Sequence, residues 1–213
     1  MATAASLPSP DRILKNALKL FSEKGYDATS VREICAAAAI TKPTLYHFYG
    51  SKEGVYRAIV EGALERFQAD MVSSLAGEGT LRDRLVRMAR AYVDAAVREP
   101  DLARFIMALI HDPPRSAPAT DFVGFYEGIL EKLAHTIDAA VARGEIATGP
   151  TEIRLLVFMG ALGEAMHGHL LAGRPRLSPD LADTLVDTVL RGWNPAPFMR
   201  RRYSVSRTSL GNP

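Results

Sequence analysis

The fold is decided by the stretch Ser30-Val-Arg-Glu-Ile-Cys-Ala-Ala-Ala-Ala-Ile-Thr-Lys-Pro-Thr-Leu-Tyr-His-Phe-Tyr49. Its opening, Ser30-x-x-Glu33, is a capping box and predicts a short helix directly after Ser30. Thr41 is a good N-cap for a second short helix, and Pro43 falls in its first turn, where the missing N–H costs little. Two helices of about two turns each, joined by a tight turn, form a helix-turn-helix.

The apolar residues of this stretch divide its surface from its interior. Ile34 and Leu45 can face each other across the turn, with Ile40 at the corner. The second helix then exposes short or hydrogen-bonding side chains, namely Lys42, Thr44, Tyr46 and His47. A DNA major groove admits one helix, and its bases are read by donors, acceptors and methyl contacts. Composition alone favours an aromatic core segment of an all-α protein, whereas the resemblance of this segment to a known family, described below, favours DNA recognition.

Start and stop signals for helices occur along most of the remaining sequence. N-cap residues, first-turn prolines and closing glycines predict further helices over about 10–24, 52–75, 80–98, 100–110, 120–143, 150–171 and 178–193. No alternating run flanked by hairpin turns predicts a strand. We therefore expect an all-α fold of about nine helices. The helix that begins after Ser51 is long enough, at roughly 35 Å, to connect two parts of the molecule.

Composition excludes several classes of protein. Hydrophobic residues make up 47% and charged residues 23% of the chain, which is close to the globular average. No apolar run approaches the roughly 18 residues of a membrane span, and the first ten residues lack the features of a secretory signal. The single cysteine, Cys35, fits a reducing compartment. We expect a soluble cytoplasmic protein with no membrane partner.

Charge is distributed unevenly around the net value of +2. Residues 1–60 carry a net charge of +3, residues 61–190 of −6 and residues 191–213 of +5. Basic N-terminal and C-terminal segments around an acidic middle segment indicate that only the two ends of the chain bind a polyanion. The Arg200-Arg-Arg202 tail can add nonspecific phosphate contacts, although a purely solubilising role explains it equally well.

Residues 11–60 resemble the DNA-binding domain of TetR-family transcriptional regulators. The resemblance is carried by Ala17-x-x-Leu20-Phe21-x-x-Lys24-Gly25-Tyr26-x-Ala28-Thr29-Ser30-Val31-Arg32-Glu33-Ile34 and by Ile40-Thr41-Lys42-Pro43-Thr44-Leu45-Tyr46-His47-Phe48-Tyr49-x-Ser51-Lys52-Glu53. It implies DNA contacts at Ser30, Arg32, Thr41, Lys42, Pro43, Thr44, Tyr46, His47 and Lys52. Tyr46 and Lys52 match the family's phosphate-contacting tyrosine and lysine. One departure is Ala39, which stands where the family has Gly in the turn.

The resemblance also implies a division into domains. Residues 1–50 form the helix-turn-helix DNA-binding domain, with the start of a linking helix at 51–75. Residues 51–193 form a helical domain for ligand binding and dimerisation, and residues 194–213 form a basic, disordered tail. Beyond residue 60 only helix number, helix length and total size agree with the family.

Aromatic and methionine side chains gather in the middle of the chain. We expect a ligand pocket lined by Met88, Tyr92, Arg104, Phe105, Met107, Leu109, His111, Phe122, Phe125 and Tyr126. Considered one at a time, most of these ten residues are typical of an ordinary hydrophobic core. As a group, a lining rich in Met and aromatic residues suits an adaptable apolar pocket, with its few polar side chains fixing the ligand.

The last two helices have the composition of an interface. Leu155-Leu-Val-Phe-Met159 is apolar on every face, and small residues follow it. We expect a two-fold homodimer through a four-helix bundle that contains Phe158, Leu162, Ala165, Met166, His169, Leu181, Leu185 and Val189.

Catalytic and metal chemistry find little support in the sequence. Glu164-x-x-His167 resembles half of a di-iron motif, but the pattern occurs only once. A Ser-His-Asp order, a nucleophile elbow and a phosphate-cradling glycine loop are absent. We therefore expect no enzyme activity, no cofactor and no metal, and an inert buried thiol at Cys35.

The sequence thus predicts a DNA-binding repressor that acts as a dimer on a palindromic operator of double-stranded DNA. A small apolar or amphipathic inducer would release it from DNA. The alternative is a ligand-independent DNA-binding or architectural protein on the same scaffold, which a filled core without a cavity would favour.

Overall fold

The computed structural model describes residues 10–111 and 116–194, and every regular element in these residues is a helix. Their bounds are α1 Pro10–Lys24, α2 Val31–Ala37, α3 Lys42–Tyr49, α4 Lys52–Ser74, α5 Leu81–Arg98, α6 Pro100–His111, α7 Phe122–Ala142, α8 Thr151–Ala172 and α9 Pro179–Trp193. The all-α prediction is confirmed, and each predicted start and end lies within two residues of the observed one. The Arg200-Arg-Arg202 tail lies outside the described residues.

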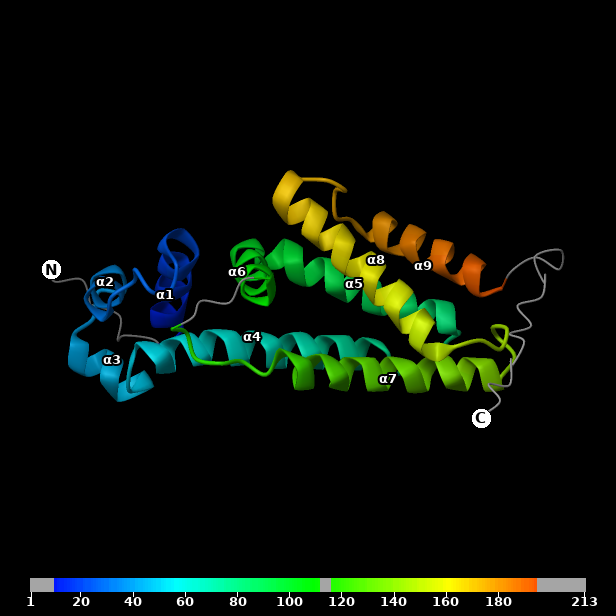
Figure 1. Cartoon of the computed structure of the whole chain (residues 1–213), viewed down its shortest axis with the longest axis horizontal. Coiled ribbons are helices and arrows are strands. Elements are labelled where there is room, and N and C mark those ends of the chain that lie inside the picture. The colour runs from blue at the N-terminus through cyan, green and yellow to red at the C-terminus, as the bar shows by residue number, and fades with distance from the viewer. Residues whose placement is uncertain (1–9, 112–115, 195–213) are drawn as a thin grey trace, which may run out of the picture.

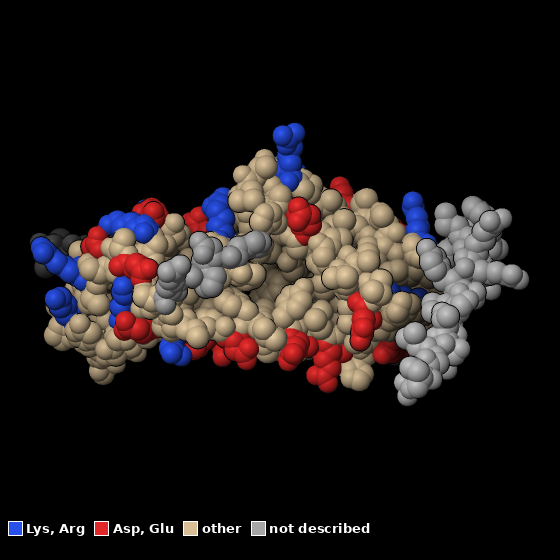
Figure 2. All heavy atoms as spheres, viewed as in Figure 1, with Lys and Arg blue, Asp and Glu red and all other residues tan. Residues whose placement is uncertain are grey.

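The molecule is elongated, with α1, α2 and α3 grouped at one end (Figure 1). The long helix α4 starts at this end and runs beside α7 along one edge of the body, while α8 and α9 lie on the opposite side of α5. The shorter α6 lies between the three-helix group and the body. Asp and Glu residues line the long edge formed by α4 and α7 (Figure 2).

The first of two hydrophobic cores holds the three-helix group together. Ile13, Phe21, Ile34 and Leu45 from α1, α2 and α3 are almost fully buried in it. The start of α4 contributes residues from Val55 to Leu64, and α6 contributes Phe105 and Leu109. The core of the helix-turn-helix is thus completed by α6, a helix from the middle of the chain.

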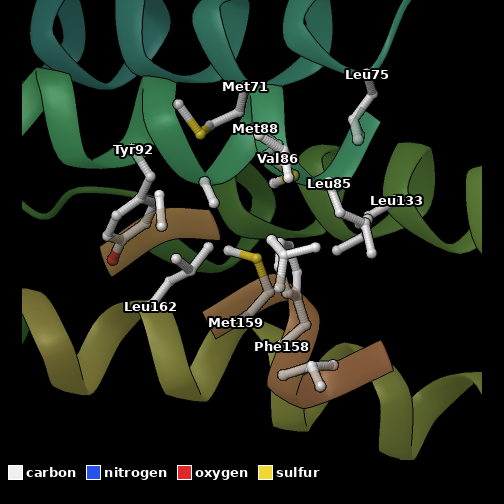
Figure 3. Close-up of a cluster of buried hydrophobic side chains, with 14 of the residues drawn as sticks. Met71, Leu75, Leu85, Val86, Met88, Tyr92, Leu133, Phe158, Met159 and Leu162 are labelled. Carbon is white, nitrogen blue, oxygen red and sulfur yellow. The ribbon is translucent and has the colours of Figure 1, made fainter. Parts of the chain in front are cut away.

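The second core fills the body between α5, α7, α8 and α9. Met71, Leu85, Met88, Leu133 and Phe158 are fully buried there (Figure 3). Two bidentate ion pairs fasten α5 to α9 at its edge. They join Arg82 to Asp187 at 2.7 and 3.0 Å and Arg90 to Asp183 at 2.9 and 2.7 Å.

Half of the residues predicted for the dimer interface lie in the core of a single chain. Phe158, Leu162, Ala165 and Val189 are at least 92% buried within one chain, and the ring of Phe158 points into the core (Figure 3). They have almost no surface left for a second copy. The helix α8 is apolar on all sides, so its sequence did not show which side faces inward. Met166, His169, Leu181 and Leu185 are only half-buried.

The outward side of α8 is strongly apolar instead. Its large exposed apolar residues are Ile153, Leu156, Val157 and Leu171, of which Leu171 is 75% exposed. By length and composition alone this helix is apolar enough to cross a membrane, and only 22% of its apolar stretch is buried. That finding corrects the prediction that no run of such length exists. Within a single chain, no other described helix covers this apolar face of α8.

Candidate nucleic-acid interface and interior cavity

The start of α2 is fixed by the predicted capping box. The Ser30 hydroxyl accepts from the Glu33 amide at 3.3 Å, and a Glu33 carboxylate oxygen accepts from the Ser30 amide at 2.9 Å. The Lys24 ammonium lies 2.5 Å from the other Glu33 oxygen. These hydrogen bonds, first the one from Lys24, lower the pKa of Glu33 to about 2. Ser30 and Arg32 are therefore held on an ordered, exposed helix start.

The recognition helix α3 presents a polar face around a single buried anchor. Leu45 is fully buried, whereas Lys42, Pro43, Tyr46 and His47 are exposed. Thr41 caps the helix, since its hydroxyl accepts from the Thr44 amide at 3.4 Å and lies 2.9 Å from the Thr44 hydroxyl. This hydrogen bond fixes the half-buried Thr44 side chain beside the cap.

The turn between α2 and α3 adopts the conformation that glycine prefers. Ala39 has φ of 50°, and it is the one described residue other than glycine with a positive φ. The turn is closed by a hydrogen bond from the Ile40 amide to the Cys35 carbonyl at 3.0 Å. The substitution of Gly by Ala therefore leaves the turn geometry in place, at a cost of about 1 kcal/mol.

Close packing also sets the angle between α3 and α4. A Cβ atom at Gly54 would lie 1.8 Å from the carbonyl oxygen of Tyr49. Any other residue would push the start of α4 away from the end of α3. Gly54 is therefore a positioning residue that sequence analysis missed.

Lys52, assigned to phosphate by the resemblance, has its ammonium group directed inward. It donates to the carbonyls of Tyr26 and Thr29, each at 3.0 Å, and lies 4.1 Å from the centre of the Tyr26 ring. The Tyr26 hydroxyl donates to Glu53 at 3.3 Å, and burial raises the pKa of Tyr26 to about 12. The geometry gives Lys52 a role in holding the α1–α2 loop against α4.

A cavity of about 440 Å³, partly open to solvent, lies between α4, α5, α6, α7 and α8. Four of the ten predicted pocket residues line it, namely Tyr92, Met107, Phe125 and Tyr126. Sequence analysis missed Phe67, Ile106, Ile110 and Met166, which also line it. Spacing along α6 was the available signal, because Leu102, Ile106 and Ile110 recur every four residues and share one face.

The other predicted pocket residues lie elsewhere. Met88 is fully buried in the second core, while Phe105, Leu109 and Phe122 pack on the first core. Arg104 is exposed and pairs with Asp101 at 2.9 Å. The side chain of His111 lies outside the described residues. Phe105 and Leu109 are buried in the first core, whereas Ile106 and Ile110, each one residue further along α6, reach the cavity.

A second, wider groove of about 830 Å³ lies at the end of the body far from α3. It is lined by the start of α8 and the end of α9, including Arg154 and Trp193. The Arg154 guanidinium donates to the Ala147 carbonyl and lies 5.5 Å from the Trp193 ring centre. This groove shares no helix with the DNA-binding end, so a ligand there has no direct route to α3.

Groups of His, Cys and acidic residues that suit a metal ion are absent from the described part of the chain. His135 and Glu131 form an exposed pair at 3.9 Å, and Glu164 is exposed on α8. Cys35 is buried and free, and burial raises the pKa of its thiol.

Comparison with known proteins agrees with this geometry. The model of "Bacterial regulatory proteins, tetR family" matches residues 13–59, and that of "Tetracyclin repressor-like, C-terminal domain" matches residues 75–189. The chain belongs to the TetR family. The two matches together span the helix-turn-helix and most of the body.

Curated TetR-family relatives match through the DNA-binding domain. The biofilm operon negative regulator IcaR of Staphylococcus epidermidis is 46% identical over 57 residues, which are 27% of this chain and 31% of IcaR. The chain thus covers about a third or less of the length of the curated relatives that it matches.

Solved TetR-family structures share the fold over nearly the whole chain. PfmR from Thermus thermophilus superposes with a TM-score of 0.71 at 24% identity, covering 90% of this chain and all of PfmR. FadR from Bacillus subtilis, solved with stearoyl-CoA, gives a TM-score of 0.70 at 16% identity over 86% of this chain and 99% of FadR. At these identities the likeness shows the fold alone.

Proposed function

We propose that this TetR-family protein is a cytoplasmic, homodimeric repressor that leaves a palindromic operator when a small apolar or amphipathic molecule binds. Residues 1–50 bind DNA, and residues 51–193 bind the ligand and dimerise. One observation carries the proposal: α6 both lines the cavity and completes the core of the helix-turn-helix.

The DNA contacts follow from the exposed ends of α2 and α3. Arg32, Lys42 and His47 offer charge or hydrogen bonds, and Thr44 can touch a base edge or a thymine methyl. Tyr46, which is 48% exposed, is placed to meet the backbone. The first-turn amides of α2 and α3 that the capping side chains do not engage favour phosphate.

The ligand reaches the DNA-binding domain through α6. Ile106, Met107 and Ile110 line the cavity, so a ligand presses on this face. On the same helix the Phe105 ring is stacked on Phe21 at 6.3 Å and meets Tyr56 edge-on at 6.0 Å. A rotation of α6 therefore shifts α1 and α4 together. Ligand binding selects the shifted state and so lowers DNA affinity.

A second copy covers the exposed apolar face of α8. Ile153, Leu156 and Val157 recur at helical spacing, and Gly160 continues the same face without a side chain. An isologous contact of this kind gives a two-fold dimer. A dimer is also what a palindromic site requires, since its half-sites lie roughly 34–36 Å apart along the duplex.

The alternative, a ligand-independent DNA-binding protein, predicts a filled body. The cavity of about 440 Å³ falls within the roughly 300–1,000 Å³ that ligand sites occupy. Its lining is mostly apolar, which supports the ligand-responsive function over the alternative.

Selection from random duplexes with the pure protein tests this function directly. We expect a palindrome, and fluorescence anisotropy on that duplex then gives the affinities of variants. Thr44→Ala relaxes the sequence preference, whereas Tyr46→Ala weakens binding to all duplexes alike. Lys132→Ala, an exposed change on α7 in the body, serves as the matched control and leaves affinity unchanged. Equal affinity of all three variants for all duplexes would overturn the proposed interface.

A further inference from the structure

We propose that the ligand of the interior cavity is a neutral carbonyl compound with an apolar body, such as a ketone or an ester, and that the Tyr92 hydroxyl donates a hydrogen bond to its carbonyl oxygen. This inference rests on the proposed function and adds the chemical class of the ligand. It also makes Tyr92 the residue that determines specificity.

Charge is confined to the rim of the cavity. The charged lining residues are Arg66, Asp70, Arg98 and Glu99, and all four are exposed. Arg98 and Asp70 pair with each other at 3.3 Å. Deeper positions are held by apolar side chains such as Phe67, Ala96 and Met166. A carboxylate taken into this interior would lose its hydration without gaining a cation, which is costly.

Tyr92 supplies the polar group of the interior. Its side chain is 92% buried, and its hydroxyl has no hydrogen-bond partner among the described residues. The hydroxyl group points away from the packed Met and Leu side chains of the second core (Figure 3). The hydroxyl is not among the fully enclosed polar atoms, so it opens onto the cavity, where an acceptor atom of a ligand can take its hydrogen bond.

The position and protonation of this hydroxyl suit a hydrogen-bond donor. The Tyr92 ring meets Phe67 edge-on at 5.3 Å and an angle of 73°, which fixes its plane. Gly163 on α8 leaves room beside the oxygen, since a Cβ atom there would lie 3.9 Å away. Burial raises the pKa of Tyr92 well above its usual value, so the phenol stays protonated at neutral pH.

The apolar walls distinguish a carbonyl from other polar groups. An amide or an alcohol brings its own N–H or O–H, which would find no acceptor on the deeper Ala, Phe, Ile and Met side chains. A ketone or ester brings only acceptors, and one donor satisfies its carbonyl. The Tyr126 hydroxyl lies nearer the surface, with the side chain 40% exposed, and is already open to water.

Calorimetric titration of the full chain with methyl decanoate and with decanoate tests the inference. We expect methyl decanoate to bind and decanoate to bind at least about tenfold more weakly, because the carboxylate must be desolvated. Tyr92→Phe keeps the ring and its packing. It should lower the affinity for methyl decanoate about 5- to 10-fold, because one hydrogen bond is lost. Tyr126→Phe is the matched control, with less than about twofold effect.

Three results would overturn the inference: no binding of methyl decanoate, equal binding of decanoate, or an unchanged affinity in Tyr92→Phe. Anisotropy on the selected duplex separates this outcome from failure of the proposed function. Ester binding as expected without any DNA binding would overturn the repressor function and leave the ligand class standing. DNA binding without ester binding would overturn the ligand class and leave the repressor function standing.

Discussion

The ammonium nitrogen of Lys52 lies 3.0 Å from the carbonyl oxygen of Thr29, across the joint between α4 and the α1–α2 loop. Thr29 precedes the N-cap of α2, and its own hydroxyl donates to the Gly25 carbonyl at 2.8 Å. The first residue of α4 therefore holds the segment from which α2 starts. Motion of α4 is transmitted to Ser30 and Arg32 as well as to α3.

Lys52→Met should destabilise the protein more than it changes the electrostatics of DNA binding. Loss of the hydrogen bonds from the ammonium lowers the free energy of unfolding by about 1–3 kcal/mol. Urea unfolding measures this loss, and the salt dependence of DNA affinity measures any phosphate contact. Lys42→Ala, an exposed change on α3, is the control and should reduce the salt slope by about one unit. If Lys52→Met left the free energy of unfolding unchanged but reduced the salt dependence of DNA affinity, Lys52 would contact phosphate after all.

Ala39→Gly should stabilise the protein. Relief of the positive φ raises the free energy of unfolding by about 1 kcal/mol, less the entropy that glycine gains in the unfolded chain. Thermal unfolding should therefore shift upward by about 2–4 °C at most. Ala37→Gly, two residues earlier and inside α2, should shift it downward. A lower melting temperature in Ala39→Gly would show that the turn is not strained.

The capping carboxylate of Glu33 predicts a pH dependence of stability. Its folded pKa of about 2 lies below the ordinary value of 4.5, so the ionised form stabilises the fold. This contribution is complete above about pH 4.5 and is lost as the pH falls toward 2. We expect wild type to exceed Glu33→Gln in unfolding free energy at pH 7 and the difference to shrink through that window. A difference that persists unchanged at pH 2 would contradict the assignment.

The helices were predictable because their signals are local. Five residues cap the helices that the sequence places after them, and each accepts a hydrogen bond from the amide three residues later: Ser30, Thr41, Ser51, Thr80 and Ser178. The polar face of α3 was also predictable, because one apolar residue, Leu45, determines which side is inside. Such features depend on neighbours in sequence.

The inward and outward sides of the body helices were not predictable in the same way. The helix α8 is apolar all round, so burial of Phe158 and exposure of Leu156 depend on where α5 and α9 pack. In α6, Phe105 and Ile106 both pack on the first core, and only Ile106 also lines the cavity. The ammonium of Lys52 turned inward because carbonyls from 23 and 26 residues away converge on it.

Leu156→Lys should convert the dimer to monomers. Leu156 is 69% exposed at the centre of the outward face of α8, where a second copy would have to desolvate the introduced ammonium group. Sedimentation velocity measures the change in mass. Val123→Lys, at a residue of α7 that is 70% exposed, is the matched control and should stay dimeric. A monomeric wild type, or a dimeric Leu156→Lys, would remove α8 as the interface.

Phe105→Leu should separate ligand binding from DNA release. Phe105 is 6% exposed and stacks between Phe21 and Tyr56, so the smaller side chain loosens the contact of α6 with the first core. The free energy of unfolding should fall by about 1–2 kcal/mol, while the residues that line the cavity stay in place. Calorimetry with methyl decanoate should therefore give an affinity within about twofold of wild type.

The same variant should respond less to the ligand in its DNA affinity. In wild type, a saturating ligand lowers operator affinity by the coupling free energy, typically about 1–3 kcal/mol. If α6 carries this coupling, the ratio of operator affinities with and without ligand moves toward one in Phe105→Leu. Met88→Leu, a substitution of similar size in the second core, serves as the control and should retain the wild-type ratio. An unchanged ratio in Phe105→Leu would mean that the ligand signal travels through α4 alone.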